Sequence, residues 1–280
     1  MFKSRRPKIG LALGSGGARG LAHLGVIKIL EKNKIPIDFI AGSSIGALVG
    51  GFYAAGLSTE EIERIVLSLD WRKVLSVLFE PSFKGGLIGG EKVRSFIYEY
   101  VGEKRIENCR MPLAIAATDL KTGEAITLKT GKMTEAIRAS VSIPLIFKPV
   151  EINGRMLADG GLSAAVPVDM ARDMGADIVV AVNLNKHYYD EDWAPGWYDI
   201  AHDSLNILQH HLSALNSADA DVVINIDAGK TFWYEFADGK NKIDIGEAAA
   251  KRALPVLRKI IREESGWTIG RYFDFLKRKK

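Results

Sequence analysis

A serine placed at a sharp turn between two apolar segments constrains this chain more than any other feature of its sequence. The motif Gly-Ser-Ser-Ile-Gly runs from Gly42 to Gly46 with Ser44 at its centre, after an apolar run at 39–41 and before a small and apolar run at 47–55. A strand, a G-x-S-x-G turn and a helix in this order form the context of a nucleophile elbow. The two glycines let the strand and the helix approach closely on either side of the serine. Ser44 is therefore the candidate nucleophile.

A membrane-spanning helix is an alternative interpretation of the same stretch. The segment from Phe39 to Thr59 contains no charged residue, and a helix of this length can span a bilayer. Gly42, Gly46 and Gly50 even have the small-xxx-small spacing of packed membrane helices. Serines and glycines near the middle and a modest hydrophobicity disfavour a span. We expect the first half of the stretch to be a buried strand.

The composition suits a globular α/β protein. A chain of 280 residues fits one large α/β domain or two small ones, and 47% hydrophobic and 26% charged residues are ordinary proportions. Cys109 is the only cysteine, so no disulfide can form within the chain, which suits a reducing compartment and a cytoplasmic protein. A net charge of +4 is too small to indicate nucleic acid as a partner.

Basic residues gather at the two ends of the chain. The arm at 3–8 resembles the start of a signal peptide, but the glycines of 14–20 interrupt the apolar run that follows it. We expect a single domain at 1–265 and a basic amphipathic tail at 266–280. The tail has apolar residues at helical spacing: Ile269, Tyr272, Phe273 and Leu276. Such a helix either docks on the domain or lies on an anionic membrane, and we expect peripheral contact at the inner membrane surface.

Strands and helices alternate along most of the chain. The predicted strands are 9–13, 39–41, 112–118, 124–129, 155–158, 178–183 and 221–226. The predicted helices are 21–33, 47–55, 58–69, 91–101, 134–139, one opened by Pro167, 200–216 and 246–264. Ser58 and Glu61 have the spacing of a capping box at the start of the third helix. This order predicts an α/β fold with a mainly parallel sheet and helices on both faces.

A glycine-rich loop from Gly14 to Gly20 joins the first strand to the first helix. A dinucleotide fingerprint would need a glycine where Arg19 stands, and the acidic residue about twenty positions on, Asp38, starts a strand rather than ending one. The loop suits an oxyanion hole better, although a nucleotide-binding module stays open as an alternative function.

An oxyanion hole would be built from backbone N–H groups. Those of Gly16 and Gly17 are the candidates in the loop, and that of Ile45, the residue after the nucleophile, would join them. Consecutive strands in an α/β sheet bring the two loops to one edge. We expect Arg19 to position the loop or to meet an anionic head group, unless it only forms a surface salt bridge.

The base that would activate the serine is less evident. No histidine follows a strand end; the five are His23, His187, His202, His210 and His211. An elbow on the second strand also comes too early for an α/β-hydrolase. Asp159 closes a predicted strand, and Gly160 and Gly161 after it let a backbone pass closely. In isolation the same sequence fits an ordinary Asp-Gly turn.

Taken together, these motifs resemble the patatin-like phospholipase family. The segments 15–20, 42–46 and 159–161 occur in the order of that family, and 139–147 resembles the stretch ahead of its aspartate. The similarity covers about 8–183, and Ser15 departs from the first glycine that the family often has. The resemblance implies a three-layer α/β/α fold with no metal or other cofactor.

The same resemblance implies a chemistry. Ser44 would be the nucleophile and Asp159 the base of a dyad without histidine, with Gly16 and Gly17 in the oxyanion loop and Arg19, Gly20, Gly42, Gly46, Gly160 and Gly161 as supporting motif residues. The expected substrates are phospholipids, lysophospholipids or other acyl esters, cleaved through an acyl-enzyme. A lipid-binding protein without turnover remains the second alternative. The apolar segment 71–88 would form an acyl-chain wall or lid, or pack in the core.

Overall fold

The computed structural model describes residues 5–68, 89–185, 196–227, 236 and 238–277, with the backbone alone at 197–199, 202 and 266–277. The strands are β1 Ile9–Leu13, β2 Phe39–Ser43, β3 Leu113–Asp119, β4 Ala125–Leu128, β5 Val150–Ile152, β6 Arg155–Asp159, β7 Ile178–Asn183 and β8 Val222–Asn225. The helices are α1 Ala22–Lys32, α2 Ile45–Ala55, α3 Thr59–Ser68, α5 Glu91–Val101, α6 Met133–Ser140, α7 Val168–Asp173, α8 Trp197–Ser217 and α9 Gly239–Lys277. The segment 71–88, which was predicted to form an acyl-chain wall or lid or to pack in the core, lies outside the described residues.

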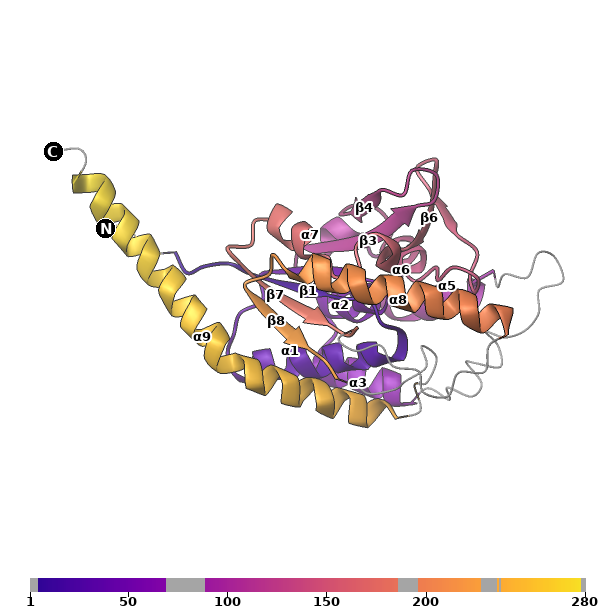
Figure 1. Ribbon diagram of the computed structural model, residues 1–280, viewed down its shortest axis with the longest axis horizontal. Coiled ribbons are helices and arrows are strands. Elements are labelled where there is room, and N and C mark those ends of the chain that lie inside the picture. Colours follow the sequence, from indigo (N-terminus) through magenta and orange to yellow (C-terminus); the bar gives the residue numbers. More distant parts are fainter. Residues whose placement is uncertain (1–4, 69–88, 186–195, 228–235, 237, 278–280) are drawn as a thin grey trace.

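The strands form one mixed sheet with helices on both faces (Figure 1). Its order is β5-β6-β3-β2-β1-β7-β8, with β4 also paired to β3. The five strands β3, β2, β1, β7 and β8 are parallel, whereas β4, β5 and β6 pair antiparallel at one end. The predicted three-layer, mainly parallel α/β fold is confirmed.

The two faces of the sheet differ in side-chain size. On β1, Ile9, Leu11 and Leu13 belong to the large core shared with α1, α2 and α9. Ala12 belongs to the other core, which is rich in alanine and is covered by α7. Small residues let this second layer lie close: a Cβ built on Gly10 would stand 2.8 Å from Ala176 Cβ. The alternation along each strand therefore sets how near each helical layer packs.

The hairpin β5–β6 was not predicted, although the sequence contains its signal. Asn153 and Gly154 both have positive φ, 53° and 76°, and Ile152 pairs with Arg155 across them. Asn-Gly in a two-residue loop is the preferred type I′ hairpin turn. The predicted strands therefore lack β5, which begins at Val150.

The last helix also differs from the prediction, because it begins at Gly239 and runs to Lys277 rather than spanning 246–264. It crosses α1 at two glycines: a Cβ on Gly246 would stand 2.0 Å from the Ala22 carbonyl oxygen, and a Cβ on Gly25 of α1 would stand 2.0 Å from the Ile243 carbonyl oxygen. Pro255 lies inside it, and the helix bends and extends beyond the rest of the described chain (Figure 1). The division at residue 265 stays a prediction.

Two local expectations can be compared directly with the structure. The capping box is present, because Ser58 N–H donates to Glu61 Oε2 at 2.8 Å and Glu61 N–H donates to Ser58 Oγ at 3.2 Å. The uncharged stretch 39–59 is divided between β2, the turn and α2. Among the helices of the described residues, none has the length and apolar character needed to cross a membrane.

Candidate active site

Ser44 stands at the junction of β2 and α2 in a conformation that non-glycine residues rarely adopt. Its φ is 54° and its ψ is −122°. Its N–H donates to Ser140 Oγ at 2.9 Å, which holds the strained turn from α6. A Cβ on Gly42 would stand 2.5 Å from the Gly46 carbonyl oxygen, so the elbow closes only with glycine at this position.

Strand β3 brings Asp159 to the serine. Residues 115–118 of β3 pair with β4 on one edge, so β2 and β6 must both use the other edge. Along that edge Ser43 pairs with Ala116 and Asp159 pairs with Ala117. The end of β6 therefore meets the end of β2, and Ser44 Oγ donates a hydrogen bond of 2.6 Å to Asp159 Oδ2.

Asp159 is buried, and hydrogen bonds hold both its carboxylate and its backbone in place. Its Oδ1 accepts from Gly161 N–H at 2.7 Å, its own N–H donates to the Ser142 carbonyl at 3.0 Å, and its carbonyl accepts from Thr118 Oγ1 at 2.8 Å. Burial raises the pKa of Asp159 from 3.8 to about 6, although the hydrogen bonds from Ser44 and Gly161 act in the opposite direction. A carboxylate with this pKa is a stronger base than an exposed aspartate and is still ionised at neutral pH.

The glycine-rich loop lies beside the elbow, because Leu13 at the end of β1 pairs with Gly42 at the end of β2. The second half of the loop forms a 3₁₀ turn that spans Gly17–Leu21. Within the described part of the chain, the N–H groups of Gly16, Gly17 and Ile45 donate no hydrogen bond to another residue. These free donors and the hydroxyl of Ser44 are at the same edge of the sheet.

Arg19 supports the loop from within. Its Nε donates to the Gly16 carbonyl at 3.2 Å, and burial lowers the pKa of its guanidinium. It forms no ion pair with any acidic residue that the structure describes. Gly20 lets the turn pack on the elbow, since a Cβ there would stand 2.3 Å from Ile45 Cγ1. The Ser15 hydroxyl is buried without a partner among the described residues.

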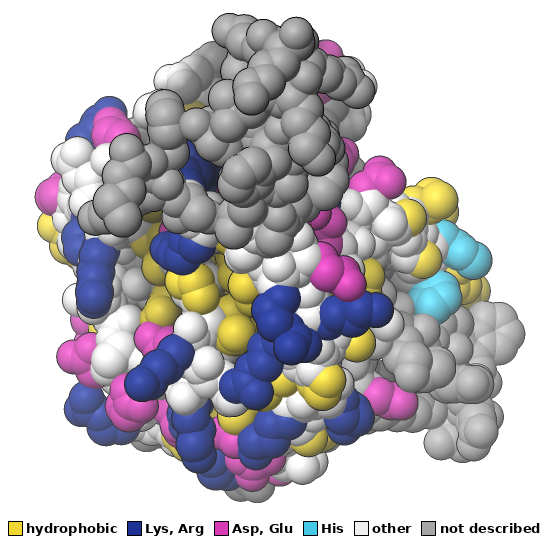
Figure 2. Space-filling model, turned by 90° about the vertical axis from the view of Figure 1, so that its left-hand side faces the viewer, with side chains coloured by type: hydrophobic (Ala, Val, Ile, Leu, Met, Phe, Trp, Pro, Cys, Tyr) yellow, Lys and Arg dark blue, Asp and Glu magenta, His cyan; other side chains and the backbone are white. Residues whose placement is uncertain are grey.

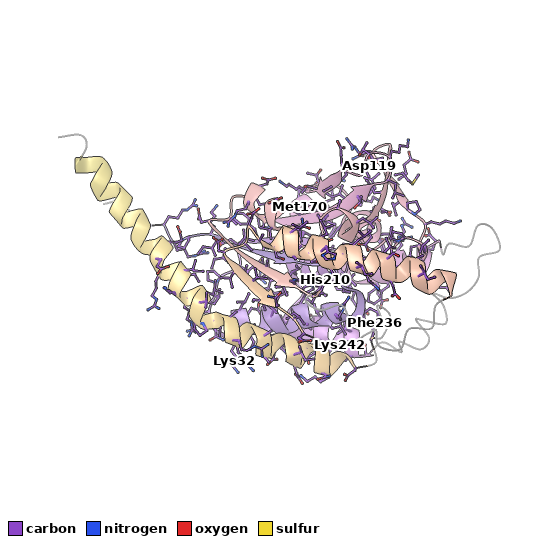
Figure 3. The ribbon with its side chains drawn as sticks, viewed as in Figure 1. Lys32, Asp119, Met170, His210, Phe236 and Lys242 are labelled. Atoms are coloured by element: carbon purple, nitrogen blue, oxygen red, sulfur yellow. The ribbon has the colours of Figure 1, made fainter. Side chains whose placement is uncertain are left out.

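The described histidines are not bonded to Ser44 or Asp159. His23 is buried under the loop, where its Nε2 bonds to the Gly14 carbonyl at 2.8 Å and burial lowers its pKa to about 4. His210 lies midway along α8 (Figure 3), and its Nδ1 bonds to the Asn185 carbonyl at 2.6 Å. The side chains of His187 and His202 are outside the described residues. No group of three His, Cys, Asp or Glu side chains in the described chain could hold a metal ion.

Sequence reasoning missed the polar residues around the pair. Ser140 and Ser142 lie in the segment 139–147: the Ser140 hydroxyl accepts from the Ser44 N–H, and the Ser142 backbone carbonyl accepts from the Asp159 N–H. Arg138 is buried behind them and donates to Ser142 Oγ at 2.6 Å. A polar run inside an otherwise apolar segment was the available signal. Which backbone groups these two serines contact could not be predicted from it.

The fold and this site define a three-layer α/β protein with a strained serine hydrogen-bonded to a buried carboxylate. A family model described as patatin-like phospholipase matches residues 11–172. The chain belongs to the patatin-like phospholipase family.

Several known proteins resemble the chain. An uncharacterised NTE family protein of Mycobacterium tuberculosis is 41% identical over 182 residues, which are 65% of this chain and 50% of that protein. Lysophospholipase NTE1 of Yarrowia lipolytica is 34% identical over 183 residues, covering 63% of this chain and 12% of that protein. The chain thus spans half the length of the mycobacterial relative and less of the yeast one. VipD from Legionella pneumophila shares the fold, with a TM-score of 0.59 at 14% identity over 89% of this chain and 67% of that chain.

Proposed function

We propose that the chain is a serine acyl hydrolase that cleaves fatty-acyl esters of phospholipids or lysophospholipids through a Ser44–Asp159 dyad. The observation that carries the proposal is the hydrogen bond of 2.6 Å from a strained serine to a buried carboxylate whose pKa is about 6. Membership of the patatin-like phospholipase family and a relative named lysophospholipase support the substrate class.

The geometry suits a two-step reaction. Asp159 accepts the proton of Ser44 Oγ as the oxygen attacks the ester carbonyl carbon. The N–H groups of Gly16, Gly17 and Ile45 stabilise the resulting oxyanion, and one such donor contributes about 3 kcal/mol. The tetrahedral intermediate collapses, and Asp159 returns the proton to the departing alcohol oxygen. Water then gives a proton to Asp159 as its oxygen attacks the acyl carbon. When the bond from that carbon to Ser44 Oγ breaks, Asp159 returns the proton to Oγ and the fatty acid is released.

A panel of substrates and a covalent probe test this proposal. The wild-type chain should hydrolyse p-nitrophenyl esters and release fatty acid from phospholipids or lysophospholipids, and a fluorophosphonate should label Ser44. A chain that binds phospholipid vesicles but is neither labelled nor active would be a lipid-binding protein. Thermal stabilisation by a nucleotide, without labelling, would favour the nucleotide-binding alternative.

The activity should depend on pH through Asp159. Its ionised form is the base, so kcat/KM for a short-chain ester should be constant at high pH and fall tenfold per pH unit below the pKa of about 6. Stopped assays between pH 4.5 and 9 on folded protein measure the inflection. A kcat/KM that stays nearly constant down to pH 4.5 would instead mean that Asp159 behaves as an exposed aspartate.

Attachment of the C-terminal tail to an anionic membrane is a further part of the proposal. Arg258 Nη2 donates to Asn33 Oδ1 at the end of α1, so the rest of α9 leaves the molecule at the amino ends of the strands, away from Ser44. Figure 2 shows many Lys and Arg side chains on the face at this end, with Asp and Glu side chains among them. Arg5 and Arg6 ahead of β1 form ion pairs with Asp177 and Asp38, but both arginine side chains are more than half exposed.

Removing 270–280 should therefore weaken sedimentation with phosphatidylglycerol vesicles at low salt. Hydrolysis of a short-chain ester should not change, because the tail is remote from the active site. Raising the salt should remove the difference between the two forms. Equal sedimentation of full-length and truncated chains at low salt would show that the tail docks elsewhere.

A further inference from the structure

The carbonyl oxygens of the glycine-rich loop are held one after another by side chains. His23 Nε2 bonds to the Gly14 carbonyl at 2.8 Å, Asn185 Nδ2 donates to the Ser15 carbonyl at 3.1 Å, and Arg19 Nε donates to the Gly16 carbonyl at 3.2 Å. Arg19 lies within the loop itself, and His23 lies in α1 directly after it. Asn185 reaches it from a different part of the fold, just after β7.

Each of these bonds sets the direction of the next N–H group. In a trans peptide the carbonyl oxygen and the following N–H lie in one plane and point in opposite directions. The bond from Asn185 to the Ser15 carbonyl therefore turns Gly16 N–H away from Asn185. The bond from Arg19 to the Gly16 carbonyl orients Gly17 N–H in the same manner. Without such bonds the glycines would be free to rotate these planes.

Asn185 is itself rigidly placed. It is 5% exposed, and its N–H donates to Asn183 Oδ1 at 2.9 Å. The second hydrogen of its Nδ2 is donated to Ser213 Oγ on α8 at 3.0 Å. The backbone carbonyl of Asn185 bonds to His210 Nδ1 on the same helix. The amide therefore has both hydrogens committed, one to the loop and one to α8.

We infer that Asn185 is a positioning residue that aims the Gly16 N–H at the oxyanion. The inference rests on the proposed function, because it assigns a supporting role in the same oxyanion hole. A donor fixed in advance needs no reorganisation when charge develops on the substrate oxygen. Asn185 touches no reacting atom and acts only through the Ser15–Gly16 peptide.

Asn185→Leu tests this role because the leucine side chain has a similar size and no N–H group. We expect kcat for a short-chain ester to fall about 10- to 100-fold, less than the 10²- to 10³-fold that follows complete loss of a donor, since Gly16 N–H is misdirected and not removed. KM should change less than about threefold, because the ground-state carbonyl depends little on the oxyanion hole. The inhibition constant of an alkyl trifluoromethyl ketone, which forms an oxyanion on Ser44, should rise by the same factor as kcat falls.

Ser213→Ala is the matched control. It removes the side-chain bond from Asn185 to α8 and keeps the bonds to Ser15 and His210. Its kcat should therefore stay within about threefold of wild type if the loop bond carries the effect. All variants are compared at equal folded fraction by thermal unfolding. If Asn185→Leu does not fold, Asn185→Ala takes its place.

Two results would overturn the inference. One is a folded Asn185 variant with unchanged kcat and unchanged ketone inhibition. The other is a Ser213→Ala loss as large as that of the Asn185 variant, which would assign the effect to anchoring of α8. Failure of the proposed function looks different, because the wild-type chain itself would then neither hydrolyse esters nor react with a fluorophosphonate.

Discussion

Ser44→Ala should abolish ester hydrolysis, with kcat lower by on the order of 10⁶-fold, as is found when a serine protease loses its nucleophile. Without Oγ no acyl-enzyme can form, and the oxyanion donors alone leave only a small residual rate. Fluorophosphonate labelling should disappear with the activity. Steady-state assays on a short-chain ester, with the probe as an independent readout, measure both.

The neighbouring serine supplies a matched control. Ser43 is fully buried, and its hydroxyl has no hydrogen-bond partner among the described residues. Ser43→Ala removes a hydroxyl of the same kind one residue away, so activity and labelling should stay within about threefold of wild type. If Ser43→Ala lost the labelling and Ser44→Ala kept it, the nucleophile would be Ser43 and the assignment to Ser44 would be wrong.

Asp159→Asn should lower kcat by at least about 10²-fold, the lower end of the range for general-base catalysis. An amide can still occupy the place of the carboxylate and accept from Gly161 N–H, but it cannot take the proton of Ser44. The pH inflection near 6 should vanish from the residual activity, because the group that titrates there has been removed. Rates measured from pH 5 to 9 decide both points.

The loss of activity in Asp159→Asn should not be caused by unfolding. The folded-state pKa of Asp159 is raised from 3.8 to about 6, so the folded protein binds the proton more tightly than the unfolded chain does. Between these two values stability falls as the pH rises, and the ionised carboxylate is unfavourable above pH 6. Asp159→Asn should therefore unfold at the same temperature as wild type or higher at pH 8, with the advantage lost below about pH 4.

The histidines give the opposing control for the dyad. Replacing the five one at a time should leave most of the activity, with His23 compared at equal folded fraction because it is buried under the loop. A histidine variant as inactive as Ser44→Ala, together with an active Asp159→Asn, would contradict the dyad and indicate a conventional triad.

Much of the site could be predicted from the sequence because its parts are local. The elbow needs glycine at positions 42 and 46, and the structure shows the backbone contacts that exclude a Cβ there. The position of Asp159 at a strand end was also readable, since Gly160 and Gly161 follow it directly. The family motifs added the pairing of this aspartate with Ser44, which no local pattern contains.

Other features depended on contacts between distant segments. The hairpin of β5 and β6 was missed even though Asn153-Gly154 marks it, because the strand β5 has only three residues. The length of α9 was underestimated, since its first turns are held by packing against α1 rather than by a strong pattern of their own. Asn185 could not be predicted as part of the site, because it is a single polar residue after a buried strand and belongs to no motif.

The sequence by itself determined the order of strands and helices, the strained turn at Ser44 and the glycines that permit it, because backbone conformation and side-chain periodicity are properties of neighbouring residues. Only the tertiary structure decided that Ser44 and Asp159 meet, because both β2 and β6 must find the same edge of β3. The raised pKa of Asp159 follows from burial by residues far apart in the chain. The aim of the Gly16 N–H likewise depends on Asn185, which is 170 residues away from Ser15 in the sequence.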